Sequence, residues 1–213
     1  MASSRMTSAD RQPKKSAVAQ AAGQIEPGLH EALAHAVTAL REEDFAQAEP
    51  RLLAILARWP EQADALHFLG VLRHTEGRRD EAIELIRRAI AVLPGMPGMW
   101  NNLGNVLIGA ERLPEAEAAY ERSVELAGNS DAAAEALNNL GTLRRRQHHL
   151  PEAEAACRRA IALRPDYAPA WYNLSQCLMA QGRVHDGLVA NSRAIMLLPR
   201  HLTARDQVLR ALL

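Results

Sequence analysis

The chain has few aromatic residues. Phe, Tyr and Trp make up 4% of its 213 residues, whereas 48% of the residues are hydrophobic, mainly alanine and leucine. Sandwiches and barrels of β-strands favour aromatic and β-branched residues, whereas closely packed helices favour alanine and leucine. We therefore predict an all-α protein.

An excess of charge of one sign is also missing. The 25 lysine and arginine residues balance 25 aspartate and glutamate residues. Such a chain has no large positive field to hold a nucleic-acid backbone or an anionic membrane, so we expect neither partner. No apolar run reaches the roughly 18 residues of a membrane span, and residues 1–28 lack the apolar core of a secretory signal. We expect a cytoplasmic protein.

The common catalytic motifs are absent as well. The chain has no Gly-x-Gly-x-x-Gly, no Gly-Lys-Ser/Thr phosphate loop and no Gly-x-Ser-x-Gly elbow. His30 and His35 resemble the histidines of a zinc-protease helix, but a spacing of five residues separates them by about 140° around a helix. They cannot bind one metal from one face. We expect no enzymatic activity, no cofactor and no metal.

What the chain does contain is a repeat. The run Trp100–Gly104 (WNNLG) recurs as Leu137–Gly141 (LNNLG) and as Trp171–Ser175 (WYNLS). A second block, Pro114–Tyr120 (PEAEAAY), recurs as Pro151–Cys157 (PEAEAAC). Self-similarity at a fixed period of this length is typical of a solenoid.

Five segments can be aligned: 29–62, 63–96, 97–130, 134–167 and 168–201. Large apolar residues at the fourth and seventh places of each segment share one helical face and predict a first helix, helix A. Small residues follow at the eighth, twentieth and twenty-seventh places, where two helices would cross closely. Pro114 and Pro151 predict the start of a second helix, helix B. Its end is predicted by Pro60, Pro94, Pro165 and Pro199.

The spacing of Trp100, Leu103, Gly104, Ala116 and Tyr120 resembles the tetratricopeptide repeat. The resemblance covers residues 29–201 and implies a right-handed α-solenoid of antiparallel helix pairs with about five repeats. The first repeat is degenerate. Three other positions depart from the family pattern: Arg73 and Arg144 replace a tyrosine of helix A, and Gly187 replaces an alanine of helix B.

The segments that flank or interrupt the repeats have separate interpretations. Residues 1–28 are interpreted as a disordered leader. Three extra residues precede the fourth repeat, so we expect its helix A to start one turn earlier, with Gly128 in a left-handed conformation and Ser130 or Asp131 as the cap. A small change of superhelical pitch is expected there, with a hinge as the alternative. Residues 202–213 are predicted to form a capping helix or the start of a sixth repeat.

Cys157 and Cys177 fall inside predicted helices, at places where other repeats carry Tyr120 or Val106. We interpret them as reduced thiols in the core. A disulfide between them is the alternative, because consecutive helices of a solenoid are neighbours.

The resemblance implies that the A helices line a concave surface. Asn102, Asn139 and Asn173 share one place in three successive repeats, a row similar to the asparagine row of O-linked N-acetylglucosamine transferase repeats. A primary amide can both donate to and accept from a peptide backbone. The predicted peptide-binding groove consists of Asn101, Asn102, Asn105, Asn138, Asn139, Arg145, Tyr172, Asn173 and Gln176. The alternative is that the asparagines only satisfy the repeat.

Three hydrogen bonds of about 0.5–1.5 kcal/mol each fall short of the roughly 8 kcal/mol of a micromolar complex. Side chains must therefore add affinity. The apolar candidates are Phe68, Ile108, Tyr172 and Met179, and Arg145 and Arg146 are available for an acidic ligand residue. The carboxylate clamp of the chaperone-binding subfamily is absent, because His67, Glu135 and Asn139 stand at its places.

The leading hypothesis is a non-enzymatic protein–protein interaction module that binds an extended peptide or a partner helix. A second hypothesis is the recognition arm of a larger glycosyl-, sulfo- or methyltransferase with its catalytic part beyond Leu213. A third is self-association through the C-terminal helix.

Overall fold

The computed structural model describes residues 27–197. Within this range the chain forms ten helices and no strand. The first helix of each pair, helix A, is α2 (Pro27–Arg41), α4 (Ala63–Thr75), α6 (Pro97–Gly109), α8 (Asp131–Arg146) or α10 (Ala168–Ala180). The second, helix B, is α3 (Phe45–Arg58), α5 (Arg79–Val92), α7 (Leu113–Ala127), α9 (Leu150–Leu163) or α11 (Val184–Leu197).

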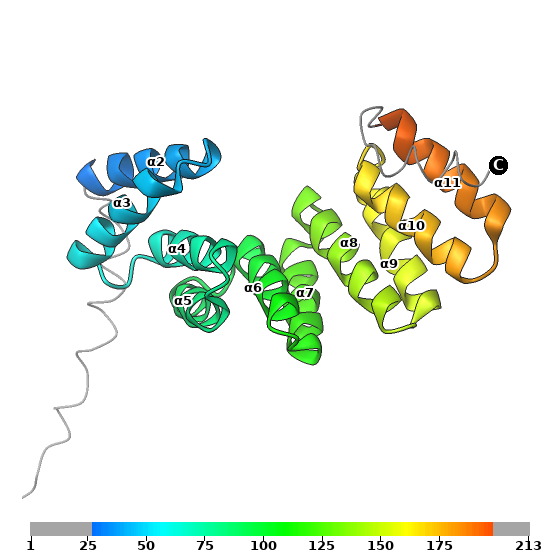
Figure 1. Cartoon of the computed structure of the whole chain (residues 1–213), viewed down its shortest axis with the longest axis horizontal. Coiled ribbons are helices and arrows are strands. Elements are labelled where there is room, and N and C mark those ends of the chain that lie inside the picture. The colour runs from blue at the N-terminus through cyan, green and yellow to red at the C-terminus, as the bar shows by residue number, and fades with distance from the viewer. Residues whose placement is uncertain (1–26, 198–213) are drawn as a thin grey trace, which may run out of the picture.

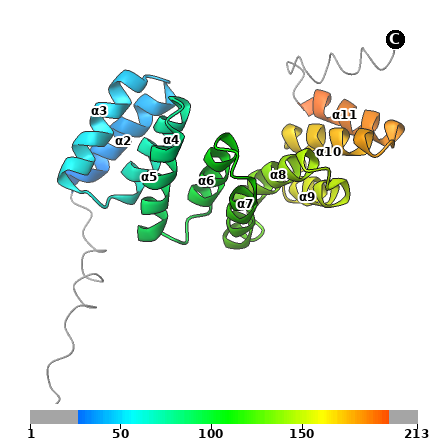
Figure 2. The ribbon, with the colours of Figure 1, turned by 60° about the horizontal axis from the view of Figure 1, so that its bottom comes forward.

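The helix pairs follow one another in chain order along the molecule (Figure 1). A second view shows the same order and places each A helix beside its own B helix (Figure 2). The backbones of consecutive A helices also contact one another from α2 to α10, whereas consecutive B helices do not approach as closely within the described part. In a curved stack, the helices that approach most closely lie on the inside. The fold is an all-α solenoid whose A helices form its inner face.

Local sequence accounts for where the helices begin and end. Pro114 and Pro151 lie in the first turns of α7 and α9, where a missing backbone N–H costs nothing. Helices α3, α5 and α9 stop just before Pro60, Pro94 and Pro165, as predicted. Pro199 lies outside the described residues.

Each turn between helix A and helix B contains a residue with positive φ at the fifteenth place of its repeat. Two of the five are glycines, Gly77 and Gly182, with φ of 80° and 79°. The other three are Glu43, Glu111 and His148, with φ of 58°, 59° and 63°. The turn geometry is therefore common to all five repeats, although only two of them carry the residue that adopts it without strain.

Glycines at the eighth place allow the two helices of a pair to cross closely. A Cβ on Gly104 would lie 2.6 Å from Cδ1 of Tyr120, and one on Gly141 would lie 2.8 Å from Sγ of Cys157. Real Cβ contacts are not this short. The prediction that small residues mark the crossings is confirmed at these two positions.

The arginines that depart from the family pattern form ion pairs between repeats. Arg73 contacts Glu49 of the first repeat at 2.5 Å and Glu76 at 2.9 Å. Arg144 contacts Glu117 of the third repeat at 2.9 Å and Glu121 at 2.6 Å. Glu49 and Glu117 occupy the same place of their repeats. The junction between the first and second repeats and the junction between the third and fourth therefore contain equivalent ion pairs.

The insertion before the fourth repeat lengthens its helix A. Helix α8 has 16 residues and starts at Asp131, whereas α4, α6 and α10 have 13. Gly128 has a positive φ of 60°, but its ψ of −119° differs from that of the left-handed helical conformation that was expected. Ser130 occupies the N-cap position, but its side chain makes no capping hydrogen bond. The leader up to residue 26 and the segment 202–213 lie outside the described residues, so the interpretations of both remain predictions.

Cys157 and Cys177 are free thiols in one buried cluster with Leu174 and Leu178. The contact with Cys177 and burial raise the pKa of Cys157, so this thiol stays protonated. The interpretation of Cys157 and Cys177 as reduced thiols in the core therefore agrees with the structure.

Candidate functional site

The candidate site is the inner face of helices α4, α6, α8 and α10. It is formed by the second, fifth, sixth, ninth, twelfth and thirteenth places of each repeat. All nine residues of the predicted groove lie on α6, α8 or α10.

The structure brings six of the asparagines together across the junctions between repeats. At each of three successive junctions, the asparagine at the sixth place donates its Nδ2 to the side chain at the fifth place of the preceding repeat. Asn102 contacts His67 Nε2 at 2.8 Å, Asn139 contacts Asn101 Oδ1 at 3.0 Å, and Asn173 contacts Asn138 Oδ1 at 2.8 Å. We call these three contacts the junction pairs.

The middle junction pair is part of a larger network. Asn139 Nδ2 also lies 3.3 Å from Oδ1 of Asn105, which accepts a second hydrogen bond from the Tyr120 hydroxyl at 2.8 Å. Burial raises the pKa of Tyr120, so its phenol stays protonated and can donate. Tyr120 on α7 thereby links the core of the third repeat to the inner face.

His67 takes the place of an asparagine in the first junction pair. Burial among its neighbours lowers the pKa of His67, although the nearby Asp64 carboxylate acts against this. A neutral imidazole can accept through Nε2 while Nδ1 carries the proton, which is the state that the contact with Asn102 requires.

Each junction pair leaves one acceptor and one donor available. In the middle pair, Oδ1 of Asn139 and Nδ2 of Asn101 have no partner within residues 27–197. In the last pair the same holds for Oδ1 of Asn173 and Nδ2 of Asn138. None of these atoms is among the polar atoms that are closed to water. A free C=O and a free NH2 group in each of these two pairs can accept from and donate to the two polar groups of a peptide bond.

The individual exposures differ along the site. Asn138 is only 6% exposed, whereas Asn101, Asn102, Asn139 and Asn173 are half-buried and Asn105 is exposed. The three remaining predicted residues, Arg145 on α8 and Tyr172 and Gln176 on α10, are half-buried on the same face.

The predicted groove omitted two residues that the network uses, His67 and Tyr120. His67 could have been included, because it occupies the same place as Asn101 and Asn138. Tyr120 was assigned to the core, where its ring does lie, and nothing in its local pattern indicates that its hydroxyl reaches Asn105.

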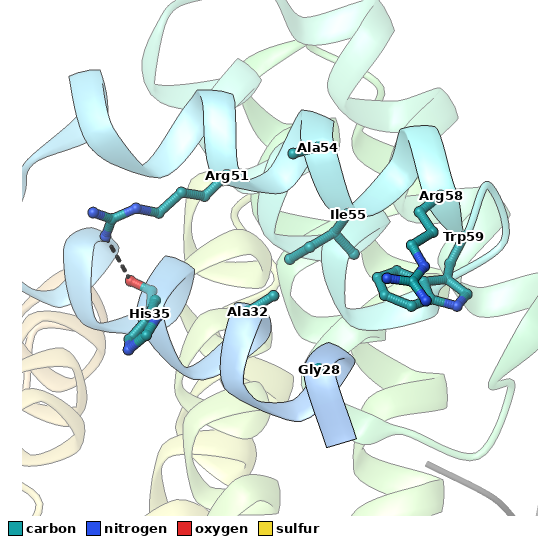
Figure 3. Close-up of a pocket in the computed structure, with 8 residues that line it drawn as sticks. All are labelled: Gly28, Ala32, His35, Arg51, Ala54, Ile55, Arg58 and Trp59. Carbon is teal, nitrogen blue, oxygen red and sulfur yellow. Dashed lines mark hydrogen bonds between the residues drawn. The ribbon is translucent and has the colours of Figure 1, made fainter. Parts of the chain in front are cut away.

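A separate cavity of about 370 Å³ lies between α2 and α3, at the start of the array (Figure 3). Its floor contains Ala32, Ala54 and Ile55, and Arg51 donates to the His35 carbonyl at 3.3 Å at one side. At the other side, the Arg58 guanidinium lies 4.5 Å from the ring centroid of Trp59. None of the predicted groove residues contributes to this cavity.

Residues 27–197 contain neither a cluster of metal ligands nor a helix that could cross a membrane. Among residues 27–197, no three His, Cys, Asp or Glu side chains gather in a way that could hold a metal ion. None of the helices in that range has both the length and the apolar character that crossing a membrane requires.

Comparisons with known proteins identify similar sequences. The peroxisomal targeting signal receptor of Eremothecium gossypii is 40% identical over 58 residues, which are 27% of this chain and 10% of the receptor. The chain therefore matches about a tenth of that relative's length.

Solved structures share the fold. YrrB, a TPR protein with an unusual peptide-binding site, superposes with a TM-score of 0.63 at 20% identity, over 91% of this chain and 96% of YrrB. A chain of the APC/C hetero-tetramer Cut9–Hcn1 superposes with a TM-score of 0.76 at 18% identity, over 85% of this chain and 36% of that chain.

Family models described as tetratricopeptide repeat match most of the chain. One matches residues 96–166, and a second matches residues 33–97 and 138–195. These matches span the helix pairs that carry the close crossings and the junction pairs. The chain belongs to the tetratricopeptide repeat family, whose arrays are protein–protein interaction modules.

Proposed function

We propose that the inner face binds an extended peptide segment of a partner protein, and that the chain acts in the cytoplasm by binding rather than by catalysis. The observation that carries this proposal is the repetition of the junction pair at three successive junctions, each with a donor and an acceptor still available.

The chemistry of the junction pairs favours an extended peptide over a partner helix. The backbone groups of a helix are satisfied within the helix, except at its ends. An extended segment offers a free N–H and a free C=O at every residue. An extended segment can therefore use the donor and the acceptor at every junction, whereas a helix offers free backbone groups only at its ends.

The hydrogen bonds supply orientation more than affinity. Two hydrogen bonds at each of three junctions, at roughly 0.5–1.5 kcal/mol for each bond, total about 3–9 kcal/mol, compared with the roughly 8 kcal/mol of a micromolar complex. Ordering each residue of the peptide backbone costs about 1–2 kcal/mol and offsets much of this gain. Apolar side chains on the same face, Phe68, Ile108 and Met179, are half-buried and can add contacts with ligand side chains. The junction pairs hold the peptide backbone, and these apolar neighbours select the sequence of the peptide.

A random-peptide library displayed on phage would test the proposal with the full chain as bait. We expect peptides selected on the wild type to bind the N102A/N139A/N173A variant at least about tenfold more weakly, because three backbone contacts are lost.

The matched control is E84A/E152A/R159A, which removes three exposed side chains of B helices that have no ion pair within the described part. It should bind like the wild type, and both variants should keep the helical circular dichroism signal. Equal binding of selected peptides by the wild type and the asparagine variant would show that the inner face is not the site.

A further inference from the structure

We infer that the bound peptide carries an acidic side chain and that Arg145 and Arg146 bind its carboxylate. These two residues are called the arginine pair below. The inference rests on the proposed function and specifies the chemistry of the partner.

The three arginines in the last turn of α8 are not equivalent. Arg144 turns toward α7 and is neutralised by Glu117 and Glu121. Arg145 and Arg146 form no ion pair within residues 27–197. The basic end of α8 therefore retains two positive charges that the described part of the molecule does not neutralise.

Two acidic residues of α8 and α9 are already engaged. Glu154 on α9 accepts from Arg158 at 2.8 Å and from Arg183 at 3.0 Å. Glu135 at the start of α8 lies 3.4 Å from Arg164. Because these two carboxylates have partners, neither pairs with Arg145 or Arg146 within residues 27–197, and our inference assigns a carboxylate of the bound peptide to this role.

Burial makes Arg145 the stronger half of the pair. Its side chain is half-buried. Its Nε is closed to solvent, so the two Nη atoms are the groups that can meet a ligand carboxylate. A half-buried guanidinium is screened less than an exposed one and can hold a carboxylate through two parallel hydrogen bonds. Arg146 is exposed and contributes charge at the rim.

The arginine pair continues the polar rows of the site. Asn138, Thr142 and Arg145 follow at i, i+4 and i+7 on α8, so they lie on one helical stripe. Seven residues correspond to about 10 Å along a helix, which roughly three residues of extended chain cover. An acidic residue within about three residues of the peptide group bound at Asn138 can therefore reach Arg145.

The arginines also have a purely structural explanation. A cation in the last turn of a helix is stabilised by the helix dipole, whatever it binds. That role depends on positive charge alone and would change stability without changing which peptides bind. Peptide selectivity therefore separates the two roles.

The test uses the full chain and the same displayed peptide library. Wild-type protein should enrich peptides with Asp or Glu at a constant spacing from the rest of the selected motif. For one selected peptide, made also with Asn or Gln in place of its acid, R145Q/R146Q should bind the acidic form about ten- to a hundredfold more weakly than the wild type does. The same variant should no longer distinguish the two forms.

Two further variants keep the result interpretable. R145K/R146K preserves the charge and should recover part of the preference, while R159Q/R193Q removes two exposed arginines of B helices and should change nothing. Added salt should weaken the acidic peptide more than the neutral one.

The outcomes separate the two proposals. Selected peptides that depend on Asn102, Asn139 and Asn173 but show no acidic preference would overturn the arginine inference alone. Unchanged acid preference in R145Q/R146Q would do the same. If the wild type selects no peptide, or the asparagine variant binds all selected peptides normally, the proposed function fails and the inference fails with it.

Discussion

Helix α6 carries two stripes that behave in opposite ways. On the packing stripe, Leu103 and Gly104 are buried, and Gly104 lies in close contact with the Tyr120 ring of α7. On the inner stripe, Asn101 and Asn102 form hydrogen bonds with neighbouring repeats across the junctions, and both still have polar atoms available. The difference shows that a single run of five residues contributes both to the packing of a helix pair and to the proposed binding surface.

The same division separates the consequences of mutation. A change on the packing stripe acts through van der Waals contacts and cavities, so it should alter folding first. A change on the inner stripe removes hydrogen bonds at a hydrated surface, so it should alter binding first. Three experiments on stability sharpen this comparison.

The largest effect is expected for Leu137→Ala. Leu137 is 1% exposed in the cluster that joins the fourth and fifth repeats, and truncating such a residue costs about 2–5 kcal/mol. Urea unfolding followed by circular dichroism measures the loss. Asn139→Ala, two residues away on the inner stripe, is the matched control and should cost about 1 kcal/mol. Similar losses for the two variants would contradict the division into stripes.

A smaller loss of stability is expected for Gly104→Ala. The added methyl group would press on the Tyr120 ring, and overpacking of this kind typically costs about 1–3 kcal/mol. Gly98→Ala in the same helix is the control, because a Cβ there would meet nothing within 4 Å. Thermal unfolding of both variants measures the contrast, and an equally small shift for the two would show that the crossing can relax.

The smallest effect concerns pH and His67. Burial lowers the pKa of His67 below the ordinary value of 6.5, so the unfolded chain binds a proton at a higher pH than the folded chain does. The contribution of neutral His67 to the free energy of unfolding is therefore complete above pH 6.5. It is lost as the pH falls toward the lowered pKa. Urea midpoints measured across this window should decline with decreasing pH.

The matched variant for that experiment is His67→Asn, which places at the first junction the residue found at the other two. It should preserve a hydrogen bond to Asn102 and flatten the decline below pH 6.5. A decline of the same steepness in the variant would assign the pH dependence to other groups.

Several features of the fold could be predicted because they depend on local chemistry. Proline removes a backbone donor wherever it occurs, so Pro60, Pro94 and Pro165 mark helix ends without knowledge of the rest of the chain. The three-residue insertion adds nearly one turn to α8 for an equally local reason.

Other features could not be predicted, because their causes lie in the surroundings. Glu43, Glu111 and His148 adopt positive φ although none is glycine, since the closing turn of each helix pair imposes this conformation. Arg73 and Arg144 look like defects in the family pattern, yet each finds its carboxylate on the preceding repeat.

The candidate site shows the same limit most clearly. The period of the repeats placed Asn102, Asn139 and Asn173 on one face, because helical geometry alone decides which residues share a stripe. It could not show which atom of each amide remains available. That depends on partners such as Asn101 and Asn138, which lie 38 and 35 residues away from the asparagines they bond. Sequence by itself determined the helices, their order and the polar row. The packing of one repeat on the next decided the hydrogen bonding of that row, because two repeats must meet before a junction pair exists.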